Sequence, residues 1–194
     1  MNNGKIKRMV GIALMMALVF VMQAITSIIP PVGGFSISLV LIPIVLGAAV
    51  FGVGAGAILG ATFGVIVYIN CYTGADPGGH MVFQANPILC FLVVMGKGIL
   101  AGVASGAVFK VLSGKNPYIA MLLAAMVCPI VNTGVFIASM LLIFKPVLAV
   151  WASGTNLVTY ILTGLVLANF VPELIINIAF SPAGRHILKI VNKH

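Results

Sequence analysis

Long runs of apolar residues alternate along the chain with short breaks that contain Pro, Gly or charged residues. A run of about 20 apolar residues is long enough to cross a bilayer as a helix. Runs near this length, together with the breaks between them, predict six helices. We therefore expect residues 1–194 to form one domain, an all-α integral membrane bundle of six transmembrane helices. The expected helix bounds are 9–29, 36–51, 54–70, 87–112, 118–144 and 156–180.

The breaks between the expected helices differ in length and in composition. Only residues 52–53 separate the second helix from the third, so these two helices are expected to form a tight hairpin. The polar stretches 71–86 and 145–155 are predicted to be loops, and residues 181–194 a short basic tail. Pro43, Pro129 and Pro172 fall inside expected helices, and Pro129 and Pro172 free backbone carbonyls that can act as acceptors in a cavity.

Basic residues gather on one side of the expected bundle. An even number of spans places both termini on the same side, and only Lys145 lies in a connection on the opposite side. Cytoplasmic loops carry an excess of Lys and Arg, so both termini are expected to be cytoplasmic. The basic residues on the side of the termini are Lys5, Lys7, Arg8, Lys110, Lys115, Arg185, Lys189 and Lys193.

The overall composition supports a membrane protein and excludes several other classes. Only 6% of the residues are charged, and soluble domains usually have about 25%. The net charge of +8 comes from bases that flank apolar spans, so the membrane surface is the expected partner and nucleic acid is not. The three cysteines are widely spaced, so we predict no disulfide framework, no metal site and no cofactor.

The two acidic residues argue against an enzyme. Asp76 falls in an expected outer loop and Glu173 lies alone in the last helix, so no second acid completes a catalytic pair. The sequence also has no GxSxG motif and no phosphate-binding Walker motif. We therefore expect neither an enzyme nor a self-contained ATPase, and the energy for any uphill transport must come from partners.

Lys97 is the strongest candidate for contact with a ligand. It lies ten residues into the fourth expected helix, about 15 Å from the outer end and near the middle of the bilayer. A charge at that depth usually faces a cavity or a partner, so Lys97 is a candidate counter-ion for an anionic ligand. The alternatives are an internal ion pair with Glu173 or extension of the side chain toward an interface.

Other polar residues inside the expected helices are weaker candidates. Asn169 and Asn177 lie four residues on either side of Glu173, which puts all three on one helix face. This face forms either part of a ligand site or a polar network that holds helices together. Asn132 and Thr133 form a second polar point just after Pro129.

The predicted loop 71–86 contains further candidates, Gln84 and Asn86 among them. This loop is either a lid over a site that opens outward or a solvated turn built on the sequence 76–79. A metal site in the loop would be weak, because one Asp and one His do not form a coordination set.

Small residues recur at intervals of four, a spacing that lets helix backbones approach closely in lipid. We expect these glycines to pack helices within the chain. Ala13 and Ala17 repeat the spacing on the first helix, where they serve either the same packing or docking to another membrane protein. The glycines in the third and fourth helices are Gly52, Gly56, Gly60, Gly64, Gly98, Gly102 and Gly106.

Taken together, these features resemble the substrate-binding S components of energy-coupling factor (ECF) vitamin transporters. The resemblance rests on six helices in 194 residues, a basic N-terminus and the Ala13/Ala17 spacing. The segments 36–47 and 52–64 are similar to the second and third helices of that family, and 83–87 and 97–102 to the start of its fourth helix. The region 35–102 looks most like the pantothenate type.

The resemblance implies a transport mechanism and a set of partners. An S component captures a small water-soluble vitamin from outside, in a pocket formed by the outer halves of helices 4 to 6 and the loop after helix 1. It docks through the Ala13/Ala17 face onto a shared transmembrane coupling subunit, and two cytoplasmic ATPases drive its toppling in the membrane. The substrate-binding residues expected for this chain are Lys97, Gln84, Asn86, Asn132, Thr133 and Asn169.

The sequence leaves other functions open. Within the same transporter class, riboflavin or a hydroxymethylpyrimidine or thiamine precursor is an alternative to pantothenate. The chain is otherwise a structural or assembly membrane protein, whose polar residues only hold helices together. A channel needs a continuous polar path, and isolated polar positions on Gly- and Ala-rich helices do not visibly supply one.

Overall fold

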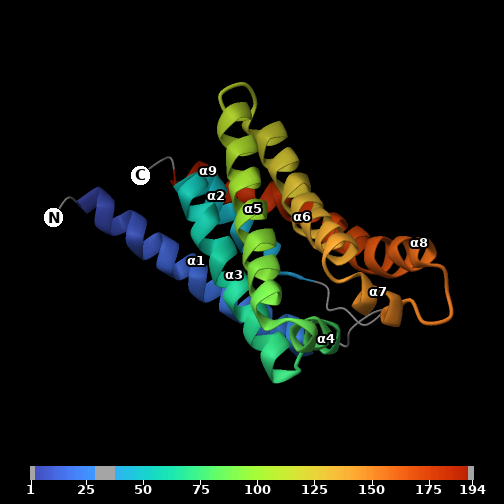
Figure 1. The fold of residues 1–194 in the computed structure, drawn as a ribbon. Helices are drawn as coiled ribbons and strands as arrows, with labels where there is room; N and C mark the ends of the chain where they lie inside the picture. The colour runs from blue at the N-terminus through green and yellow to red at the C-terminus, as the bar shows by residue number, and fades with distance from the viewer. Residues whose placement is uncertain (1–2, 29–37, 192–194) are drawn as a thin grey trace.

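The computed structural model describes residues 3–28 and 38–191, with side chains for 4–26 and 38–184, and these residues form helices and short connections without a strand (Figure 1). The prediction of an all-α protein is therefore confirmed. The helices are α1 (Asn3–Ile28), α2 (Leu41–Phe51), α3 (Val53–Thr73), α4 (Pro77–Ala85), α5 (Pro87–Leu112), α6 (Pro117–Leu142), α7 (Lys145–Trp151), α8 (Leu157–Tyr160), the π-helix η1 (Ile161–Phe170) and α9 (Val171–Val191).

Five segments of the described chain are long and apolar enough to cross a membrane. These are Gly4–Thr26, Val53–Thr73, Pro87–Leu112, Pro117–Leu142 and Leu157–Gly184. The second expected helix, 36–51, is shorter in the structure, because α2 begins at Leu41 and has only 11 residues. Gly52, at φ +90°, separates α2 from α3 in a backbone conformation that glycine adopts readily, so these two helices follow each other almost directly.

Both long predicted loops contain a short helix, which corrects the sequence prediction. α4 lies within 71–86 and α7 lies within 145–155. Each begins with a proline in its first two positions, where the missing N–H costs nothing, but neither has the long apolar run that identified the other helices. The predicted tail 181–194 is also wrong in part, because α9 continues through Pro182 to Val191.

Glycines hold α3 and α5 in close contact, as their spacing predicted. A Cβ atom on Gly60 would lie within 3.0 Å of the backbone of Gly98, and one on Gly56 would meet the backbone of Gly102 in the same way. Neither helix has room for a side chain at these positions, so the two backbones pack directly against each other (Figure 1). Farther along the pair, Ser105 donates a hydrogen bond from its hydroxyl to the carbonyl of Ala124, which joins α5 to α6.

The two ends of the bundle differ. The start of α1 and the end of α9 lie toward one side in Figure 1, whereas α4 and α7 lie toward the other. α1 packs on α2 and α3 with only part of its surface, so many of its apolar side chains are exposed. The functional cavity described next lies near the α4 end.

Candidate functional site

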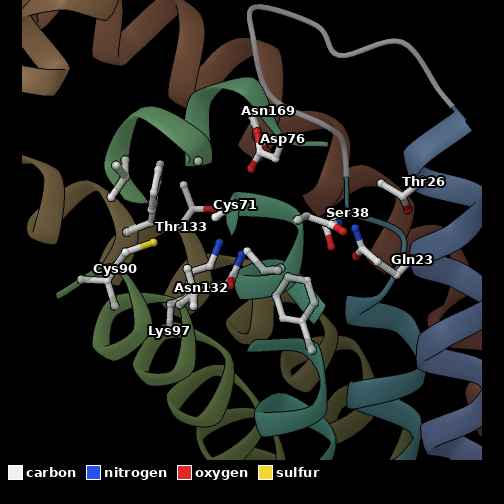
Figure 2. A pocket seen from close by; sticks show the side chains of 18 of the residues that line it. Gln23, Thr26, Ser38, Cys71, Asp76, Cys90, Lys97, Asn132, Thr133 and Asn169 are labelled. Atoms are coloured by element: carbon white, nitrogen blue, oxygen red, sulfur yellow. The ribbon is translucent and has the colours of Figure 1, made fainter. Parts of the chain in front are cut away.

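A cavity opens among α1, α3, α4, α5, α6 and the η1–α9 segment (Figure 2). The space open to the centre of a water molecule inside it measures about 100 Å³. A cavity holds one water with only about 10–15 Å³ of such space, so this one has room for a small organic molecule. Its wall is polar in several places, with side chains that come from helices far apart in the sequence.

Lys97 projects into this cavity from α5. Its Nζ lies 5.0 Å from the ring centroid of Phe136 and 5.6 Å from that of Phe63, so the ammonium has an aromatic face on two sides. Such contacts stabilise a cation, but they leave its hydrogen-bond donors without acceptors. Within the described residues no carboxylate oxygen pairs with Nζ, so the internal ion pair with Glu173 considered from the sequence does not form.

Glu173 lies on the same cavity wall, near the start of α9, with only 3% of its surface exposed. Its Oε1 accepts a hydrogen bond of 2.9 Å from the backbone N–H of Ser38. Its Oε2 is also buried and has no hydrogen-bond partner among the described residues. One oxygen of this carboxylate is therefore held by the protein, and the other has no hydrogen bond among the described residues.

Asp76 closes the cavity at the α4 end. It precedes α4 at the N-cap position, and its Oδ1 is buried without a hydrogen-bond partner in the described structure. Gly79 lies so close that a Cβ there would meet the Asp76 carboxylate and the Cys71 sulfur within 3.0 Å. Burial raises the pKa of Asp76 above its ordinary value of 3.8, while the Gly79 amide, the Lys97 ammonium and the Gly78 amide act in the opposite direction. The sequence placed Asp76 in an outer loop, and the structure makes it part of the cavity.

Three further amide and hydroxyl side chains line the polar wall. Asn132 and Thr133 reach the cavity from α6, just beyond Pro129, and are 5% and 8% exposed. Oδ1 of Asn132 is buried without a partner in the part of the chain that the structure describes. Asn169 comes from the π-helix η1, a helix type that is frequent at functional sites. In Figure 2, Asn169 and Asp76 enter from one end of the cavity, and Lys97 and Asn132 from the other.

The structure thus brings four of the six expected substrate-binding residues to one cavity and leaves two outside it. Gln84 is exposed on α4 and its Nε2 lies 2.9 Å from Nε2 of His80. Asn86 is the N-cap of α5, where its Oδ1 accepts the N–H of Leu89. A short polar side chain before a proline-initiated helix is a common capping signal, and it explains Asn86 without a ligand.

Several cavity residues were not singled out from the sequence. Phe63 and Phe136 look like ordinary apolar helix positions, and Ser38 precedes α2 with no motif around it. Cys71 and Cys90 also line the cavity, both of them buried and free. No periodicity marks these residues, because their contribution depends on how α3, α5 and α6 face one another. The described residues contain no group of three His, Cys, Asp or Glu that could hold a metal ion.

A second surface of interest lies on α1. Ala13 and Ala17 are both exposed, so the small-residue pair does not pack another described helix. Large apolar side chains around them are exposed as well: Leu14 is 68% exposed and Phe20 is 54%. The α1 face is therefore apolar, has small side chains at Ala13 and Ala17, and is not covered by another described helix.

Comparison with known families identifies one match over most of the chain. A family model described as "ECF transporter, substrate-specific component" matches residues 7–182. Comparison with curated protein sequences gave no match. The matched region contains every cavity residue described above, from Ser38 to Glu173.

Proposed function

The chain belongs to the substrate-specific component family of ECF transporters, and we propose that it binds a water-soluble vitamin, with pantothenate as the favoured ligand. Members of this family are membrane-embedded subunits of transporters rather than enzymes. The observation that carries the proposal is the position of Lys97 on the wall of a polar cavity, with no described carboxylate paired with its ammonium. A cation in such a site attracts an anionic ligand, because pairing removes the cost of an isolated charge in low dielectric.

Each polar residue on the wall has a role in this proposal. Lys97 is the counter-ion for the ligand's carboxylate, and it acts as a point charge rather than as a two-pronged donor. Asn132, Thr133 and Asn169 supply the hydrogen bonds that orient the ligand. Phe63 and Phe136 form apolar walls on either side of the ammonium and suit the gem-dimethyl part of pantothenate.

The same proposal covers the transport step and its partners. The chain docks through the α1 face that contains Ala13 and Ala17 onto a transmembrane coupling subunit, and two cytoplasmic ATPases supply the energy. The exposure of both alanines supports this docking. After docking, the subunit topples in the membrane and presents the cavity to the cytoplasm.

We further propose that the chain crosses the membrane six times, with both termini cytoplasmic. The sixth crossing requires α2, whose 11 residues are shorter than a bilayer but largely buried against neighbouring helices. A helix enclosed by protein does not need full membrane length, since lipid does not surround it. The start of α1 and the end of α9 lie toward the same side of the bundle, which supports an even number of crossings.

The experiment that tests the binding function is calorimetric titration of the purified protein with a panel of vitamins. Sub-micromolar binding of pantothenate is the expected result. Binding of riboflavin or of a thiamine precursor instead would keep the transporter class and replace the ligand. A structural or assembly protein would bind none of them and would show no ligand-induced thermal stabilisation.

A further inference from the structure

The cavity wall contains two unsatisfied groups of opposite kind. Lys97 offers donors that no described carboxylate accepts, and Glu173 offers one buried oxygen that no described donor reaches. The two side chains line the same cavity but do not pair with each other. An internal ion pair would have satisfied both at once, so their separation calls for an explanation.

The Glu173 oxygen is the more informative of the two. A buried polar atom without a hydrogen bond costs about 1–3 kcal/mol, and more when the group is charged. The backbone of Ser38 already holds Oε1 in place, so the carboxylate cannot rotate freely to find another donor. Asn177 does not supply one, because its Nδ2 donates to the backbone carbonyl of Glu173 rather than to the carboxylate. Among the described residues no other donor reaches Oε2, so the occupant of the cavity is the candidate donor.

The Lys97 ammonium, in contrast, has hydrogen-bond donors without a described carboxylate to accept them. Its aromatic neighbours stabilise the charge from two sides, yet neither Phe63 nor Phe136 can accept a conventional hydrogen bond. An acceptor on the ligand would satisfy the ammonium without moving it. The cavity therefore has an ammonium on α5 that can bind an anion and a carboxylate oxygen on α9 that can accept a hydrogen bond.

We propose that the ligand carries two separate groups, an anionic group that pairs with Lys97 and a hydroxyl or N–H donor that bonds Glu173 Oε2. This inference rests on the proposed function and deepens it by stating which substrate class the site selects. Pantothenate and biotin belong to this class, because each has a carboxylate at one end and donors elsewhere. Nicotinate has the anion without a separate donor, and pyridoxine and riboflavin have donors without the anion.

The test pairs changes in the protein with changes in the ligand. Panthenol replaces the carboxylate of pantothenate with an alcohol. The dideoxy analogue has no other donor, because hydrogen replaces both hydroxyls and a methyl group replaces the hydrogen of the amide. Affinities of the three ligands are measured by calorimetry for the wild type, Lys97→Met and Glu173→Gln. Lys110→Met is the control, because Lys110 lies on the same helix, is exposed and is outside the cavity. A thermal-unfolding scan of each variant shows that it is folded.

Each variant is expected to weaken mainly the ligands that carry the group which the substituted residue contacts. Charge-assisted hydrogen bonds contribute about 1.5–3 kcal/mol, so Glu173→Gln should weaken pantothenate about tenfold and the dideoxy analogue less than about twofold. Lys97→Met should weaken pantothenate more than about tenfold and panthenol less than about twofold. Equal weakening of all three ligands by either variant would overturn the proposal. The substituted residue would then not contact the carboxylate or the donor assigned to it. The affinities of the wild type alone give a second test of the proposal. The wild type should bind both analogues less tightly than it binds pantothenate.

A vitamin panel separates failure of this inference from failure of the proposed function. Tight binding of pantothenate or biotin, with weak binding of nicotinate, supports two-point recognition. Tight binding of pyridoxine, riboflavin, thiamine or nicotinate overturns two-point recognition and leaves the vitamin-binding function standing. Absence of binding to every vitamin removes the proposed function and this inference with it.

Discussion

The backbone N–H of Ser38 donates to Oε1 of Glu173 across 2.9 Å, although 135 positions separate the two residues in the sequence. This bond joins the segment before α2 to the start of α9. It also fixes the direction of the carboxylate, so that Oε2 remains buried without a described partner. One hydrogen bond thus contributes both to the packing of the bundle and to the chemistry of the cavity.

Lys97→Met should weaken the binding of an anionic ligand by more than about tenfold, because the variant keeps the length of the side chain and removes the charge. Calorimetry with pantothenate measures the change. Lys110→Met, on the exposed surface of the same helix, should bind as the wild type does. Unchanged affinity in Lys97→Met would assign Lys97 to structure rather than to ligand contact.

Gly98→Ala should destabilise the protein by about 1–3 kcal/mol, because its Cβ would press against the backbone of Gly60 and force α3 and α5 apart. Gly96→Ala is the matched control on the same helix, since nothing lies within 4 Å of the Cβ that it would add. Gly96→Ala should be neutral or slightly stabilising, because alanine favours helix by up to about 1 kcal/mol. Thermal unfolding in detergent compares the two, and equal melting temperatures would show that the backbones are not in contact.

Asp76→Asn should stabilise the protein near neutral pH and lose that advantage in acid. Burial raises the pKa of Asp76 in the folded state above its ordinary value of 3.8. Between the two pKa values the folded protein binds more protons than the unfolded chain, so the free energy of unfolding falls as pH rises through this window. The ionised carboxylate therefore opposes folding at neutral pH, and Asn removes this effect while it keeps a capping side chain.

Melting temperatures of wild type and Asp76→Asn over a pH series check this sign. The difference in favour of Asp76→Asn should be largest near neutral pH and should disappear as the pH falls below about 4, because the carboxyl then becomes protonated in the unfolded chain as well as in the folded protein. A difference that grows with falling pH would mean that the ionised form of Asp76 stabilises the fold.

The long helices were predictable because their signal is local. α5 occupies the predicted range 87–112, and α6 differs from the prediction by one or two residues at each end. The glycine spacing predicted close packing of helices within the chain, and the structure shows that the helices packed by these glycines are α3 and α5. The short helices α4 and α7 were missed because seven to nine residues carry no full apolar run. The π-helix η1 has no sequence signal of its own.

The cavity was predictable only in part. Lys97, Asn132, Thr133 and Asn169 stood out because polar residues inside apolar helices are costly unless they face a cavity or a partner. Glu173 stood out for the same reason, but its bond to Ser38 and its place beside the other cavity residues depend on tertiary packing. Asp76 was assigned to a loop because the sequence does not show that α4 folds back over the cavity.

The central claim is that the cavity around Lys97 binds a small anionic vitamin. Calorimetric titration of the purified full chain with pantothenate tests it most directly, with the rest of the vitamin panel run beside it. The account predicts saturable, sub-micromolar binding of pantothenate with one ligand per chain, weakened by Lys97→Met and not by Lys110→Met. Failure to bind any vitamin or vitamin precursor at sub-micromolar affinity would contradict it.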